Sequence, residues 1–126
     1  MRRPGFVLVV EDDANIRDVV QMALTDEGYV VETAPNGAAA LELAERARPD
    51  LILLDMRMPV MDGWDFARTY RERPGPHAPI VVLTASRKVA EWAAEVSAQG
   101  YVGKPFDLEE VLTAVAHHVH PPDNAR

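Results

Sequence analysis

Short, continuous apolar runs alternate along the chain with segments whose apolar residues recur at helical spacing. The runs are rich in valine, leucine and isoleucine, which is typical of strands buried on both faces of a parallel sheet. Such strands are predicted at residues 6–10, 29–34, 51–54, 80–84 and 100–103.

The segments between these runs each carry one apolar face. In the first of them, the apolar residues from Ile16 to Leu24 recur at helical spacing, and Gly28 ends the pattern. Asp107 and Glu110 form a capping-box pattern at the start of the last segment. Further helices are predicted at residues 38–47, 64–72, 89–96 and 108–119. Strands that alternate with helices predict an α/β fold, with five parallel strands and five helices that cover both faces of the sheet.

Composition narrows the class of protein. The chain has 126 residues, a net charge of -7 and no cysteine. This is the length of one ordinary domain, so a single domain is predicted over residues 1–126, with 121–126 as a flexible tail. The lack of cysteine excludes disulfides and a thiolate zinc site. No stretch approaches the roughly 18 apolar residues of a membrane span, and no signal-peptide cleavage site follows the start. We therefore expect a cytoplasmic protein, without membrane contact, whose acidic surface disfavours direct nucleic-acid binding.

Polar residues follow the predicted strands. The acids Glu11, Asp12 and Asp13 follow the first, Asp55 follows the third, Thr84 ends the fourth and Lys104 comes directly after the fifth. The carboxyl ends of parallel strands meet at one edge of the sheet, where open α/β folds form their sites. A carboxylate cluster without cysteine or histidine suits Mg²⁺ or Mn²⁺, and a divalent cation would offset the repulsion between the acids. A carboxylate can also accept a phosphoryl group, whose charge a metal, a lysine and a hydroxyl can neutralise.

Four stretches of the chain closely resemble one protein family, the receiver domains of two-component response regulators. They are "VVEDD" at 9–13, "DLILLDMRMPVMDG" at 50–63, "VVLTA" at 81–85 and "YVGKPF" at 101–106. The resemblance covers nearly the whole chain, and each motif stands at the end of the expected element. It implies the flavodoxin-like, doubly wound strand order 2-1-3-4-5 of chemotaxis regulators, an order that the handedness and pattern rules alone do not give.

The resemblance also implies a metal site and a phosphoacceptor. In the family, Asp12 would bind Mg²⁺ directly and Glu11 through a water molecule, and Mn²⁺ could substitute for Mg²⁺. Asp55 would be both the phosphoacceptor and a metal ligand, and the main-chain carbonyl of Arg57 would complete the protein ligands. Asp13 is expected instead to favour the start of the first helix, where a negative charge meets the helix dipole.

The remaining implied roles concern the switch. Thr84 and Lys104 would contact the phosphoryl group, and Tyr101 would turn inward when Thr84 moves. The Lys104–Pro105 peptide bond would be cis, a geometry that only proline makes common. Residues 57 and 86, which tune phosphoryl lifetime in the family, are Arg57 and Ser86 here.

Two departures from the family pattern affect the fourth helix. The segment from Thr84 to Lys104 is about two residues shorter than the family usually has, so the fourth helix or the loop before it should be short. Ser97 occupies a position where glycine commonly ends this helix, which brings the usual turn into question.

The function implied is a phosphoacceptor switch that assists its own phosphorylation and dephosphorylation, rather than an enzyme with a separate substrate. Its donor would be a histidine kinase or a phosphotransfer protein. Its output would pass through the face made by residues 89–96, 100–103 and 108–119 to a protein target or a second copy, and the chain's ending suggests a stand-alone receiver. Two alternatives remain: a degenerate receiver used only for docking, and, less well supported, a small phosphatase with an aspartate nucleophile.

Overall fold

The computed structural model describes residues 4–119, in which strands and helices alternate strictly. The strands of this part are β1 (Phe6–Val10), β2 (Val30–Ala34), β3 (Leu51–Asp55), β4 (Ile80–Thr84) and β5 (Gly100–Gly103). The helices are α1 (Ala14–Asp26), α2 (Gly37–Arg46), α3 (Gly63–Glu72), α4 (Val89–Glu95) and α5 (Leu108–His118). Across residues 4–119, every helix falls short of the length and apolar character that a membrane span requires. The predicted tail, 121–126, lies outside the described residues.

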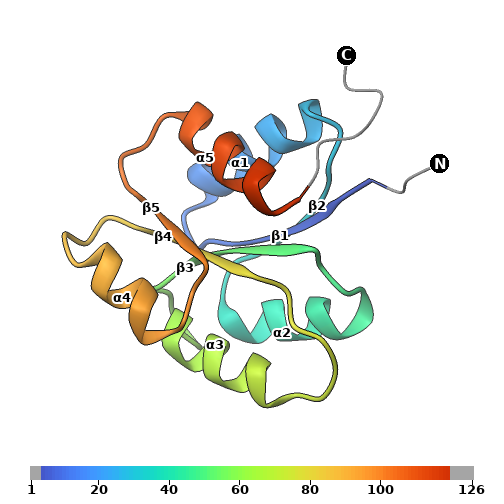
Figure 1. The fold of residues 1–126 in the computed structure, drawn as a ribbon, viewed down its shortest axis with the longest axis vertical. Coiled ribbons are helices and arrows are strands. Elements are labelled where there is room, and N and C mark those ends of the chain that lie inside the picture. The colour runs from blue at the N-terminus through green and yellow to red at the C-terminus, as the bar shows by residue number, and fades with distance from the viewer. Residues whose placement is uncertain (1–3, 120–126) are drawn as a thin grey trace.

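The five strands form one parallel sheet in the order β2-β1-β3-β4-β5. Helices α1 and α5 cover one face of this sheet, and α2, α3 and α4 cover the other (Figure 1). The predicted α/β class, the flavodoxin-like strand order and the five helices are therefore confirmed. The strand order reverses at β1, which lies between β2 and β3, and this reversal opens a crevice at the carboxyl ends of β1 and β3.

Alternate side chains of the central strands pack into two apolar cores, one on each face of the sheet. Every residue of β1, β3 and β4 is buried, as expected when helices cover both faces. Leu8, Ile52 and Val82 point to the core under α2, α3 and α4, where Phe66 is fully buried. Their neighbours Val9, Leu53 and Leu83 point to the core under α1 and α5. The cores hold the strands in register, so the residues after each strand are held at one edge.

The short helix α4 ends without the usual glycine. It has seven residues, fewer than the other helices of the described range. Ser97 adopts the left-handed conformation that glycine would favour, with φ 53°. The Arg71 guanidinium, on α3, donates hydrogen bonds to the carbonyl oxygens of Val96 and Ser97. The turn therefore forms with serine, because a side chain from the neighbouring helix binds its carbonyl groups.

Candidate functional site

Three carboxylates meet at the carboxyl edge of the sheet. Glu11 and Asp12 directly follow β1, Asp55 is the last residue of β3, and these two strands are neighbours. One oxygen of each carboxylate lies within 4.8 Å of the others. Glu11 and Asp55 are buried and Asp12 is exposed, so the cluster is open to solvent on one side. Three carboxylate oxygens, with no nitrogen or sulfur ligand among them, suit a hard cation such as Mg²⁺.

Lys104 brings a positive charge into this cluster. Its main-chain N–H donates to the carbonyl oxygen of Thr84 at 2.8 Å, which continues the pairing of β5 with β4. Its Nζ lies 2.6 Å from Glu11 Oε1 and 3.8 Å from Asp55 Oδ2. The other Glu11 oxygen accepts a hydrogen bond from the Asp13 N–H at 3.1 Å. Glu11 is thus the closer partner of Lys104, a pairing that the sequence did not predict.

The surroundings of Asp55 oppose its negative charge. Burial is the largest cause that raises the pKa of this carboxyl group, and the charge of Glu11 raises it further. The charge of Lys104 lowers the pKa, while hydrogen bonds with the side chains of Asp12 and Glu11 raise it. The net result raises the pKa of Asp55 from 3.8 to about 7. The site therefore contains more negative charge than Lys104 alone can balance.

Asp13 differs in role from the two acids before it. Its Oδ1 accepts hydrogen bonds from the N–H groups of Asn15 at 2.9 Å and Ile16 at 3.1 Å. These N–H groups lie in the first turn of α1 and have no partner within the helix. The prediction that Asp13 favours the start of this helix is confirmed.

A cavity of about 440 Å³ opens beside Asp55. Its walls come from the ends of β3 and β4, from the residues after β5 and from α4: Asp55, Arg57, Thr84, Ala85, Ser86, Trp92 and Lys104. Thr84 is buried, and its Oγ1 accepts a hydrogen bond from the Ser86 N–H at 3.4 Å. The structure thus brings the predicted acceptor, hydroxyl and ammonium to a single cavity.

Two further predicted residues lie on β5 or just after it. Tyr101 is 53% exposed, so its ring lies outside the core. The Lys104–Pro105 peptide bond is cis, as the resemblance implies.

The Arg57 side chain extends toward α4. Its Cζ lies 5.2 Å from the centroid of the Trp92 ring. This contact was not predicted from sequence, because residues 57 and 92 lie far apart in the chain and no local pattern links them.

Comparison with known proteins decides the family. Residues 7–116 match the family model described as response regulator receiver domain. This chain belongs to that family. The receiver is 40% identical over 127 residues to response regulator MprA of Mycolicibacterium vanbaalenii, an alignment that covers 97% of this chain and 54% of that protein. The receiver therefore spans about half the length of this curated relative.

Solved structures share the fold of the receiver. Chemotaxis response regulator CheY4 of Vibrio cholerae has a TM-score of 0.84 and 37% identity, over 93% of this chain and 100% of that one. Response regulator TrrA of Thermotoga maritima, in complex with Mg²⁺-BeF, has a TM-score of 0.81 and 33% identity, over 91% and 99% of the two chains. These likenesses agree with the observed fold and strand order.

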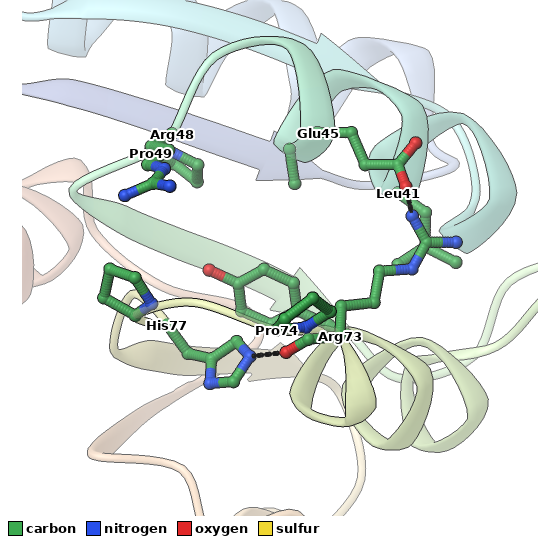
Figure 2. A pocket seen from close by; sticks show the side chains of 10 residues that line it. Leu41, Glu45, Arg48, Pro49, Arg73, Pro74 and His77 are labelled. Carbon is green, nitrogen blue, oxygen red and sulfur yellow. Dashed lines mark hydrogen bonds and ion pairs between the residues drawn. The ribbon is translucent and has the colours of Figure 1, made fainter.

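The receiver has another cavity, of about 230 Å³, at the amino ends of β3 and β4. Figure 2 shows that the Arg73 guanidinium at its wall forms an ion pair with Glu45, and that His77 Nε2 bonds to the Arg73 carbonyl oxygen. This cavity lies at the opposite ends of the strands from Asp55. Two of its charged groups, Arg73 and Glu45, are already paired with each other.

Proposed function

We propose that this receiver accepts a phosphoryl group on Asp55 in a Mg²⁺-dependent reaction and passes the change to a protein partner. The observation that carries the proposal is the shared cavity, in which Asp55 lies with a buried hydroxyl, Thr84, and an ammonium group, Lys104. A phosphoryl group needs positioning and charge neutralisation more than covalent assistance, and this set of groups supplies both.

Of the three carboxylates in the cluster, Asp55 is the best suited to be the acceptor. Glu11 is fully buried, and its two oxygens are engaged by Lys104 and by the Asp13 N–H. Asp12 is exposed and does not line the cavity. Asp55 does line it, so an incoming phosphorus atom can approach a carboxylate oxygen there.

Glu11, Asp12, Asp55 and the carbonyl oxygen of Arg57 would hold the cation, with Glu11 acting through water. Mg²⁺, or Mn²⁺ in its place, supplies the positive charge that the excess of carboxylates lacks. The cluster of carboxylate oxygens within 4.8 Å of one another supports this assignment. A magnesium–fluoroberyllate complex of the similar regulator TrrA supports it as well.

In the transfer, an Asp55 carboxylate oxygen forms a bond to phosphorus, while the bond from phosphorus to the donor atom breaks. The donor leaves with the electron pair of that bond. Lys104 Nζ, 3.8 Å from Asp55 Oδ2, needs only a small shift to bind a phosphoryl oxygen. The Thr84 hydroxyl donates to another, because hydrogen bonds to charged acceptors are the strong ones. The donor would be a histidine kinase or a phosphotransfer protein.

The output follows from the movement of Thr84. Its hydroxyl turns toward the phosphoryl group, and the exposed Tyr101 ring turns into the space that is vacated. The face made by α4, β5 and α5 then changes as a population shift, and it binds a protein target or a second receiver.

The decisive experiment is phosphorylation with acetyl phosphate, read by intact mass. The parent should gain one phosphoryl group in Mg²⁺ and none in chelator, and hydroxylamine should remove it because the bond is an acyl phosphate. Asp55→Asn should gain none. Asp13→Asn is the matched control, since asparagine caps a helix about as well as aspartate and should leave uptake intact. A label mapped to Asp12 or Asp13 would overturn the proposal.

The switch is tested with a pair of structures, with and without beryllofluoride and Mg²⁺. Thr84 and Tyr101 should both move inward in the bound form. If Thr84 moves while Tyr101 keeps one rotamer, the tyrosine has no part in the output.

A further inference from the structure

An exposed arginine lies beside the proposed phosphorylation site. Arg57 stands two residues after Asp55, and its guanidinium rests over the Trp92 ring, with Cζ 5.2 Å from the ring centroid. Within residues 4–119, this guanidinium makes no hydrogen bond or ion pair. Its attractive contact is therefore the one with the indole, a cation–π interaction.

Trp92 is a fixed support for that contact. Its side chain is 9% exposed, and its ring meets the Trp64 ring at 4.8 Å between centroids, at an interplanar angle of 68°. Trp64 is held in turn, because its Nε1 donates to Glu95 Oε1 at 2.8 Å. Trp64 belongs to α3, and Trp92 and Glu95 belong to α4, so the indole is fixed between two neighbouring helices.

Arg57 and Trp92 line the same cavity as Asp55 and Lys104. The contact places Cζ over the ring, and none of the five N–H donors of the guanidinium is engaged by a residue of the described range, so these donors stay available. Arg57 can therefore donate to phosphoryl oxygens without leaving Trp92. Asp55 is buried and Arg57 is exposed, which puts the guanidinium on the solvent side of the cavity.

We propose that Trp92 is a positioning residue that prolongs the lifetime of the phosphoryl group on Asp55 by acting through Arg57. It holds Arg57 across the solvent side of the cavity, where the guanidinium binds the phosphoryl group and blocks water. This inference rests on the proposed function. In hydrolysis, a water oxygen bonds to phosphorus while the bond from phosphorus to the Asp55 oxygen breaks. Asp55 leaves as a carboxylate, and the protons of the water pass to phosphate and solvent. The water must attack opposite the breaking bond, and Arg57 is the exposed arginine that lines the cavity through which such a water would come.

The test is the rate of phosphoryl loss, measured by intact mass after acetyl phosphate is removed. Trp92→Leu removes the ring face, and Arg57→Gln removes the cation. Each should speed the loss roughly two- to fivefold, the order expected of an exposed cation–π contact. The double variant should lose phosphate no faster than the faster single variant, because both changes break the same contact. Arg68→Gln, which alters an exposed arginine paired with Asp65 at 3.0 Å, should keep the parent rate.

A conservative variant separates positioning from packing. Trp92→Phe keeps an aromatic face, and it should restore most of the lifetime that Trp92→Leu loses. If both variants lose phosphate equally fast, the ring face has no role and the inference fails. It also fails if Arg57→Gln leaves the rate unchanged or slows it, and this exposed substitution remains informative even if Trp92→Leu does not fold.

A second measurement needs no phosphoryl group. The chain has two tryptophans, so Trp64→Phe leaves Trp92 as the single emitter. In that background Arg57→Gln should change the emission of Trp92, and Arg68→Gln should not. If Arg57→Gln leaves the emission spectrum of the Trp64→Phe background unchanged, Arg57 does not contact Trp92 and the inference fails. A parent that stays unphosphorylated while Arg57→Gln changes the spectrum would instead overturn the proposed function, and the lifetime role with it.

Discussion

The interior of the sheet and its carboxyl edge are both buried, yet they are built in opposite ways. Along β1, β3 and β4 the buried side chains are apolar up to the last residue of each strand. At the edge lie Glu11, Asp55 and Thr84, which are the buried polar or charged side chains of the described residues. Within residues 4–119, each of their buried polar atoms has a hydrogen-bond partner.

The comparison indicates that the apolar interior stabilises the fold, whereas the polar edge holds the groups available for chemistry. The interior contributes stability through area removed from water, which requires only apolar residues of suitable volume. The edge keeps two acids buried against one lysine, an arrangement that raises the pKa of Asp55 and weakens the fold. Substitutions in the two regions should therefore have opposite effects on stability.

The largest effect should come from the interior. Leu53→Ala removes a fully buried side chain from the core under α1 and α5. It should lower the free energy of unfolding by about 2–5 kcal/mol, because it loses transfer free energy and leaves a cavity. Urea denaturation followed by circular dichroism measures this. A loss below about 1 kcal/mol would mean that the core collapses around the gap.

The edge should respond in the opposite direction. In chelator at pH 8, Asp55→Asn should raise the free energy of unfolding by on the order of 1–2 kcal/mol, because it removes an ionised acid from beside Glu11. Thermal melts of parent and variant compare the two, and Asp62→Asn, at the N-cap of α3, is the control that should change stability little. A melting temperature lowered by Asp55→Asn in chelator would contradict the repulsion argument.

Mg²⁺ should restore part of the stability that repulsion among the carboxylates of the edge removes. A dissociation constant in the millimolar range is expected for a small, open set of oxygen ligands. A Mg²⁺ concentration about ten times that constant then adds about 1.4 kcal/mol to the free energy of unfolding of the parent. The gain should shrink in Asp12→Asn, which weakens the site, and should persist in Leu53→Ala. Titration of the melting temperature with MgCl₂ measures it. Equal titration curves for Asp12→Asn and parent would remove Asp12 from the ligand set.

The smallest effect is a pH slope. Unfolded Asp55 loses its proton near its ordinary pKa of 3.8, and the folded group loses it near 7. Between these values the folded protein binds more protons, so in chelator the stability that Asp55 contributes falls as pH rises. The loss should total on the order of 1–2 kcal/mol between pH 4 and pH 8, the same amount that Asp55→Asn should regain at pH 8, so the change per pH unit is small. Below pH 4 the difference between parent and Asp55→Asn should have no slope. Equal pH profiles for the two proteins would show that Asp55 ionises normally.

Local pattern was sufficient for most of the fold. The apolar runs and helical spacing located every strand and helix of the described range to within two residues or so, because burial on two faces or on one face leaves a distinct period in sequence. The single-domain extent over 1–126 stays a prediction. At the edge, the acids, hydroxyl and lysine that follow β1, β3, β4 and β5 were enough to predict that Glu11, Asp12, Asp55, Thr84 and Lys104 lie together, since parallel strands end at one edge.

Tertiary structure decided which of these side chains meet. The Glu11–Lys104 pair joins residues 93 positions apart, and its preference over Asp55 depends on side-chain geometry at the ends of β1 and β5. Ser97 completes the end of α4 because Arg71 reaches its carbonyl group from α3. Trp92 meets Arg57 because α4 packs beside the loop after β3. Sequence fixes the period and order of residues along one chain, whereas contacts between elements depend on how helices pack on a sheet, and no local pattern encodes that.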